Sequence, residues 1–179
     1  MRRLLVPALF SLLLAACGSS HPSAGGGQYV GGTVPLECAP FARALTGLAL
    51  RGDAAGWWDA AEGRYSRGHT PQVGSVLVLT RSSRLPYGHV AVVSHLLERR
   101  KILVTQANWV HHRVTEDQAM IDVSPANDWS QVQVFWPPSG QMGGGVYTVS
   151  GFVGPGRRTT PQEIAEATPR AIRLASSGY

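Results

Sequence analysis

The chain has 179 residues, of which 44% are hydrophobic and 15% charged, and its formal net charge is +5. This composition is typical of one globular domain with room for tails. No stripe of Lys and Arg with interleaved aromatic residues occurs, which argues against nucleic-acid binding. A mild positive excess suits an acidic polymer or a membrane surface instead.

The N-terminus has the pattern of an export signal. Met1-Arg2-Arg3 is a positive start, 4–14 is a short apolar run, and Ala15-Ala16 precede Cys17. We predict a signal peptide over 1–16, too short for a membrane span. Residues 14–17 resemble a bacterial lipobox, which implies a lipid on Cys17 and a protein of the cell envelope. If the host has two membranes, Gly18 after the cysteine implies the outer membrane, facing the periplasm. The alternative is an ordinary signal peptide.

The residues after the signal form two parts. Residues 17–28 are rich in Gly, Ser and Pro and are expected to be a flexible tether. A helix is predicted to begin at Cys38, because Pro40 suits a first helical turn and apolar residues recur at helical spacing from Phe41. Cys38 would be the unpaired thiol of an exported chain, at a helix start that favours its thiolate. A small buried cysteine is the plainer alternative.

A second short helix is predicted over 54–61, with Asp53 as its cap. Adjacent Trp57 and Trp58 cannot share a face of it, so one is expected in the core and the other could line a groove; the favoured alternative is that both rings are structural and partly buried.

Strands follow. The pattern predicts them over 75–80, 89–94, 102–109, 120–123, 132–136 and 146–153, with a break at Gly143–Gly145. Loops too short for helical crossovers imply an antiparallel sheet, so the expected fold class is α+β, with N-terminal helices packed on that sheet. We predict the folded domain over 29–155 and a tail over 156–179, in which the capping-box spacing of Thr160 and Glu163 indicates a short helix.

A base for the thiol is expected on the second of these strands. His89 begins it, and a hairpin turn of two or four residues near Glu98 would place His89 on the same face as Gln106 and Asn108 of the next strand. A one-residue slip in register would remove this arrangement. Cysteine, histidine and a polar amide in this order match the papain-like arrangement for nucleophilic catalysis.

Several motifs now resemble a known family. The chain from about Tyr29 to Pro138 is similar to a CHAP domain, the cysteine, histidine-dependent amidohydrolase/peptidase family, with a papain-like fold. The similar segments are Glu37-Cys38, Gly52-Asp53, Trp57-Trp58, Gly74-Ser75-Val76, Gly88-His89-Val90, Asn108-Trp109 and Asp122 to Ser130. The resemblance implies that Cys38 is the nucleophile, His89 the base, and Gln106 or Asn108 the residue that orients His89. Trp58 and Trp109 are the expected substrate contacts.

Two residues depart from the family pattern. Glu37 stands where Gln is frequent, and Gln106 stands where an acid is common. Gln106 could orient an imidazole but adds no charge. The other histidines are expected to be structural, Asp122 and Asp128 to fix turns, and no cluster suggests zinc or another cofactor.

Three hypotheses follow for function. The leading one is a lipid-anchored cysteine hydrolase of peptidoglycan, cutting the muramoyl–alanine amide or a bond within the stem peptide or cross-bridge. The second is a catalytically weak or inactive envelope lipoprotein that binds peptidoglycan. The third is an amidase acting on a small soluble conjugate. The partners implied by the first two are peptidoglycan and, through the N-terminal lipid, a membrane.

Overall fold

The computed structural model describes residues 25–178. The predicted signal peptide and lipobox Cys17 lie outside these residues. Within residues 25–178, the helices are all too short or too polar to cross a membrane.

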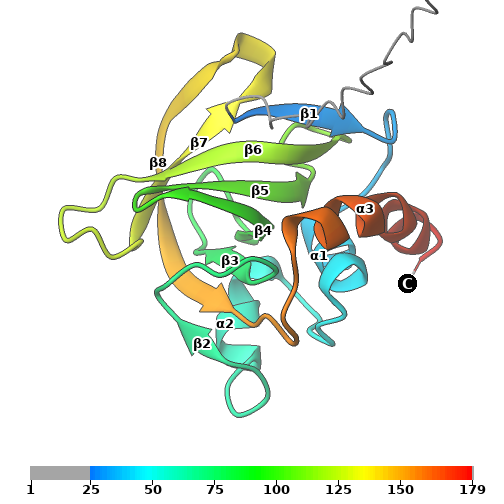
Figure 1. Cartoon of the computed structure of the whole chain (residues 1–179), viewed down its shortest axis with the longest axis horizontal. Coiled ribbons are helices and arrows are strands. Elements are labelled where there is room, and N and C mark those ends of the chain that lie inside the picture. Colours follow the sequence, from blue (N-terminus) through cyan, green and yellow to red (C-terminus); the bar gives the residue numbers. More distant parts are fainter. Residues whose placement is uncertain (1–24, 179) are drawn as a thin grey trace, which may run out of the picture.

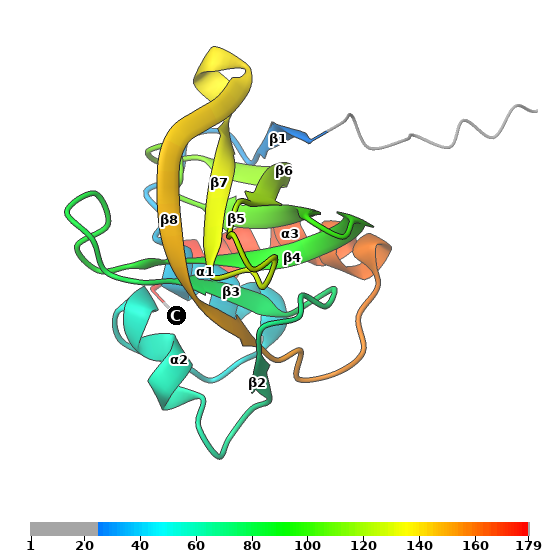
Figure 2. The same cartoon turned by 90° about the vertical axis from the view of Figure 1, so that its left-hand side faces the viewer.

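Eight antiparallel strands make the body of the molecule (Figures 1 and 2). They run in the order β1-β6-β5-β4-β3-β8-β2, and β7 pairs with both β6 and β8, which closes six of the strands into a barrel. Their bounds are β1 Gly26–Val30, β2 Arg67–Gly68, β3 Val76–Leu79, β4 His89–Glu98, β5 Lys101–Ala107, β6 Val114–Asp122, β7 Gln131–Trp136 and β8 Gln141–Val153. The barrel has no open edge between β6 and β8, since β7 fills that gap.

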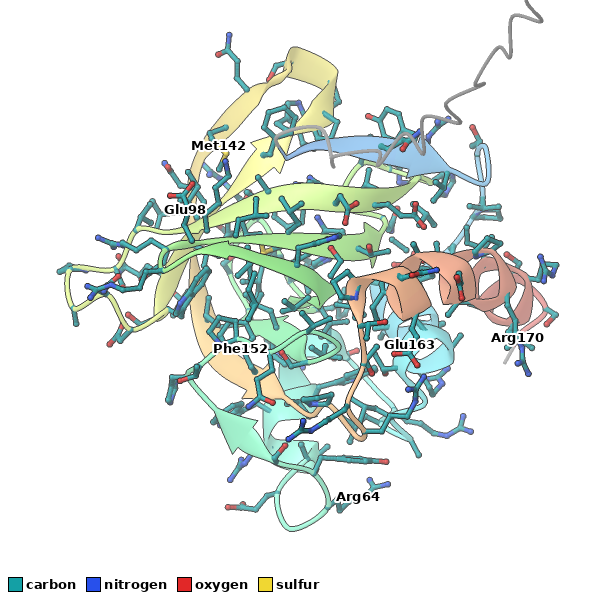
Figure 3. All side chains as sticks on the ribbon, in the orientation of Figure 1. Arg64, Glu98, Met142, Phe152, Glu163 and Arg170 are labelled. Atoms are coloured by element: carbon teal, nitrogen blue, oxygen red, sulfur yellow. The ribbon has the colours of Figure 1, made fainter. Side chains whose placement is uncertain are left out.

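Both faces of the central strands are buried, which explains their unbroken apolar sequence. On β3, Leu77 and Leu79 point into the cluster inside the barrel, while Val76 and Val78 point into a second cluster outside it. The same alternation continues on β4, where Ala91 and Val93 belong to the inner cluster. Figure 3 shows Phe152 of β8 pointing inward among the strands, and Arg64 and Arg170 pointing away from the body.

Helices cover the outer cluster. α1 (Cys38–Thr46) buries Phe41, Ala42 and Leu45 and lies beside α3 (Pro161–Ser176), as Figure 1 shows. The predicted second helix is present as a 3₁₀ turn η1 (Ala54–Gly56) followed by α2 (Trp57–Ala60). Trp57 is fully buried in the outer cluster, as one of the two tryptophans was expected to be. A 3₁₀ turn η2 (Pro137–Ser139) joins β7 to β8.

The structure corrects four predictions of where segments begin or end. The tether predicted to reach residue 28 gives way at Gly26 to β1, which pairs with β6. β6 begins at Val114, ahead of the strand predicted from residue 120. Gly143–Gly145 do not break the chain but lie within β8, because that strand pairs with β7 along its first half and with β3 along its second. The tail predicted from residue 156 contains α3, which has the expected capping box but packs on α1 as part of the domain.

Candidate active site

Cys38 is the first residue of α1 and is partly exposed. Glu37 is the N-cap residue and makes no side-chain cap, so the first N–H groups of the helix remain without an intrahelical acceptor. Those groups and the positive end of the helix dipole favour a negative charge on the sulfur. The local sequence therefore places a thiol where its thiolate is stabilised.

His89 is the first residue of β4 and is 4% exposed. Gly88 makes this position possible. It adopts φ +71°, and a Cβ there would lie 2.6 Å from the Cβ of Ala55 and 2.6 Å from the carbonyl oxygen of Leu79. The chain can therefore pass closely beneath η1 and deliver His89 to the cleft only without a side chain at residue 88.

The register that was expected to join His89 to Gln106 exists, but it is reached in an unexpected way. The β4–β5 turn is tight, with Glu98 paired to Lys101, yet β4 contains two irregularities, one near Leu97 and one near Ser94. Each shifts the pairing by one residue, so a single one would have placed His89 on the opposite face from Gln106. Because there are two, the original parity returns, and His89 Nε2 lies 2.8 Å from Gln106 Oε1.

Cys38 and His89 act on each other as a pair, and their pKa values shift in opposite directions. Burial on its own would raise the pKa of the Cys38 thiol, but the charge and hydrogen bond of His89, with a further hydrogen bond from the Val90 backbone, lower it below its ordinary value. Burial would lower the pKa of His89, but the Cys38 thiolate, Gln106 and the nearby Glu37 carboxylate raise it. The pair therefore favours thiolate and imidazolium.

A buried chain of polar groups continues beyond His89. Gln106 Nε2 donates to Gln118 Oε1 at 2.9 Å, and Gln118 Nε2 donates to the main-chain carbonyl of Phe135 at 2.6 Å. The Thr115 hydroxyl also donates to Gln118 Oε1. Gln118 and Thr115 were missed in the sequence because the polar run Thr115-Glu116-Asp117-Gln118 resembles a loop. A bulge at Asp117, with φ +53°, turns both side chains to one face.

Asn108 is not the residue that orients His89. Its Nδ2 donates to Glu37 Oε2 at 3.0 Å, and its Oδ1 accepts from the His112 backbone N–H at 2.9 Å. Of the two candidates, Gln106 therefore holds the ring. Asn108 instead joins the end of β5 to the residue before the nucleophile, and it fixes the Glu37 carboxylate at the rim of the site.

Two clefts meet at His89. The first, of about 420 Å³, contains Cys38, Glu37 and Asp53. The second, of about 460 Å³, is lined by Trp109, Tyr147 and the three glycines of β8. Arg84, Leu85, His89 and Asn108 line both. Trp109 stands edge-on to His89 with ring centroids 5.0 Å apart, so an aromatic wall borders the base.

Trp58 is not at this site, contrary to expectation. It packs on β8 at Gly151, where a Cβ would lie 2.3 Å from its ring, and it lies near His69 and Arg67. It lines neither cleft.

The remaining expectations concern histidines and acids. His95 bonds Asp117, and the rings of His111 and His112 stack at 3.7 Å. Asp122 accepts from Ser124 and Asp128 from Ser130, which confirms their roles in turns. Within residues 25–178, no group of His, Cys, Asp and Glu is arranged to hold a metal ion.

A comparison with known protein families finds a match over part of this chain. Residues 28–108, from β1 to the end of the predicted site, match the CHAP domain. No curated protein matches the sequence. Among solved structures, the chain is similar to the crystal structure of Ly7917 with the hydrolyzing product of MDP, at 18% identity and a TM-score of 0.41, covering 74% of this chain and 57% of that one. The crystal structure of Ly7917 itself gives 16% identity and a TM-score of 0.40, covering 74% and 56%. The chain thus spans little more than half the length of that protein.

Proposed function

We propose that this chain, which carries a CHAP domain over residues 28–108, is a cysteine-dependent hydrolase that cleaves an amide bond of peptidoglycan. The bond would be the N-acetylmuramoyl–L-alanine amide or one within the stem peptide or cross-bridge. The observation that carries the proposal is that Cys38 and His89 line one cleft together and shift each other's pKa toward thiolate and imidazolium, at the point where a second cleft meets the first. A pair of this kind is what thiol-dependent amide hydrolysis needs.

The chemistry would proceed in two steps. The Cys38 thiolate attacks the amide carbonyl carbon, and the Cys38 backbone N–H stabilises the oxyanion that forms. His89 then gives its proton to the leaving amine as the C–N bond breaks, which leaves a thioester. In the second step His89 takes a proton from water, the resulting hydroxide attacks the thioester, and the C–S bond breaks to release the carboxylic acid and restore the Cys38 thiolate beside the protonated His89.

The two clefts suggest how a substrate would lie. The second cleft touches His89, which protonates the amine, but not Cys38, so the amine half of the substrate fits there against Trp109 and Tyr147. The acyl half fits the first cleft, beside the start of α1. This direction follows from the roles of the two groups, because the proton donor must stand on the side of the leaving group.

Purified sacculi test the proposal. The wild-type protein should release new amino groups, and Cys38→Ala should release none, since the Cys38 sulfur is the atom that attacks the carbonyl carbon. Mass spectrometry of the digested muropeptides then identifies the bond. Undiminished release by Cys38→Ala would refute the assignment of the nucleophile.

The cellular location is a separate proposal. The lipobox at residues 14–17 supports a protein anchored by a lipid on Cys17 in the cell envelope, at the outer membrane and facing the periplasm. Cells grown with labelled fatty acid should label the wild-type protein and not Cys17→Ser. Equal labelling of the two would remove the anchor, while the hydrolase proposal would be untouched.

A catalytically weak or inactive protein that binds peptidoglycan is the second candidate. Glu37 favours it, because a carboxylate beside the nucleophile opposes thiolate formation. Such a protein would bind sacculi but release no amino groups, and its Cys38 would react with alkylating reagents as an ordinary thiol.

A further inference from the structure

A buried chain of hydrogen-bonded side chains leads from His89 on β4, across β5 and β6, to a main-chain carbonyl of β7. Its side chains are His89, Gln106 and Gln118, of which the two glutamines are 1% and 0% exposed. The chain ends at the carbonyl oxygen of Phe135 on β7. Each link is 2.6–2.9 Å long, so the groups are within hydrogen-bond distance throughout.

The direction of every hydrogen bond in this chain follows from its last member. A main-chain carbonyl can only accept, so Gln118 must turn its Nε2 toward Phe135 and its Oε1 toward Gln106. That oxygen can only accept, so Gln106 must present its Nε2 to Gln118 and its Oε1 to His89. The Gln106 oxygen again can only accept, so His89 must carry a proton on Nε2. The reverse direction would set two oxygens 2.6 Å apart at Phe135.

Thr115 does not decide this direction, because a hydroxyl can both donate and accept. Its bond to Gln118 Oε1 fills the second lone pair of that oxygen. Gln118 is therefore the residue through which the Phe135 carbonyl fixes the orientation of the Gln106 amide.

We propose that Gln118 is a positioning residue, which fixes the neutral His89 ring as the tautomer protonated on Nε2 and so keeps Nδ1 free to accept the thiol proton of Cys38. Nε2 is held by Gln106, which leaves Nδ1 for the hydrogen bond to Cys38. The imidazolium ion has an N–H on both nitrogens, so the same chain of bonds serves before and after proton transfer. This inference rests on the proposed function only for its effect on turnover.

The test uses ¹⁵N-labelled histidine spectra in a Cys38→Ala background, where His89 titrates without the thiolate. With Gln118 in place, neutral His89 should be a single tautomer protonated on Nε2. Gln118→Met has nearly the same shape but can neither donate to Phe135 nor accept from Gln106, and should give a mixture of tautomers. If Gln118→Met fails to fold, Gln118→Asn replaces it in the test. Its side chain is one methylene too short to reach both partners, so it should also give a mixture of tautomers.

Thr115→Val is the matched control. It removes a buried hydroxyl bonded to the same Gln118 oxygen and keeps the shape of the side chain. The direction of the hydrogen bonds from His89 to Phe135 is unchanged, so His89 should remain a single tautomer. Three results would overturn the proposal. They are a single His89 tautomer in both Gln118 variants, a neutral His89 protonated on Nδ1 in Cys38→Ala itself, and a mixture of tautomers in Thr115→Val equal to that in Gln118→Met.

A second measurement follows the thiol in the presence of Cys38. In Gln118→Met the pH at which Cys38 becomes reactive toward iodoacetamide should rise, and kcat on sacculi should fall at least about tenfold with little change in KM. The spectra and the alkylation use no peptidoglycan. They therefore test the positioning role of Gln118 even if the protein hydrolyses no substrate.

Discussion

The Cys38 thiol and the His89 ring share one proton, and three neighbours decide where it resides. The Val90 backbone N–H donates to Cys38 and favours its thiolate. The Gln106 side-chain oxygen accepts from His89 and favours its imidazolium. Glu37 acts on both groups by charge alone, raising the pKa of the thiol and of the ring together. Gln106 carries no charge, so it stabilises the imidazolium by a hydrogen bond alone.

Glu37→Gln should therefore move the pH profile. Removing the negative charge makes the thiolate easier to form and the imidazolium easier to deprotonate, so both limbs of the activity profile should shift to lower pH by a fraction of a unit. The glutamine oxygen still accepts from Asn108, so the geometry is kept. The measurement is kcat/KM against pH.

Asp53→Asn is the control for this change. Asp53 lines the same cleft, but its carboxylate lies 2.8 Å from Arg81, whose positive charge offsets its own. Its profile should coincide with the wild type. A shift to higher pH in Glu37→Gln would contradict the electrostatic role given to Glu37.

At the scale of elements, the site depends on where two strands and a helix begin. The sequence was sufficient to predict that Cys38 starts a helix and His89 a strand, because Pro40 and the apolar spacing are local signals. It was also sufficient to predict the face of Gln106, but for an incomplete reason, since two irregularities in β4 cancel. Bulges depend on pairing partners distant in the chain, so neither they nor Gln118 on bulged β6 had a signal in the sequence.

Gly88→Ala tests how His89 is positioned. The new methyl group would meet Ala55 and the Leu79 carbonyl at 2.6 Å, in addition to the cost of a left-handed residue. We expect a loss of about 2–5 kcal/mol in the free energy of unfolding and about 100-fold in kcat, because His89 must move. Urea unfolding and kinetics on sacculi measure the two effects.

Gly63→Ala is the control that separates the strain of a left-handed backbone from the displacement of His89. Gly63 has a similar φ of +66°, but a Cβ there meets no atom within 4 Å. It should lose about 1–2 kcal/mol of stability and keep its kcat. Equal loss of kcat in the two variants would show that Gly88 does not position His89 in the way described.

At the scale of the whole molecule, a closed barrel and a helical layer share the task of holding the site. The antiparallel α+β class was predicted correctly from short apolar strands and short loops. Closure was not, because it depends on the pairing of Val146–Thr148 with β7 and of Val149–Val153 with β3, and partners distant in the chain leave no local signal. Gly143–Gly145, which weaken a strand and indicate a turn when considered alone, lie in β8 where its register with β7 is irregular. The packing of α3 on α1 was missed for the same reason, since contacts distant in the chain decide it.

Ile164→Ala tests whether α3 belongs to the domain. Ile164 is 3% exposed and packs in the cluster that contains Phe41 of α1. We expect a loss of about 2–4 kcal/mol in the free energy of unfolding, measured in urea, with kcat unchanged where the protein is folded. Leu174→Ala, on the same helix but only partly buried, should lose about 1 kcal/mol. Equal and small losses would make α3 a dispensable tail.

The rate at which iodoacetamide alkylates Cys38, measured against pH, tests the central pair most directly. The wild-type rate should rise with a midpoint below that of an ordinary thiol, about 8.5, because His89 lowers the pKa of Cys38. In His89→Asn the midpoint should move up to the ordinary value or above it, since burial and the Glu37 charge both raise the pKa of the thiol and only the Val90 backbone hydrogen bond remains to lower it. A wild-type midpoint at or above about 8.5 that His89→Asn leaves unchanged would contradict the thiolate–imidazolium pair, and with it the hydrolase.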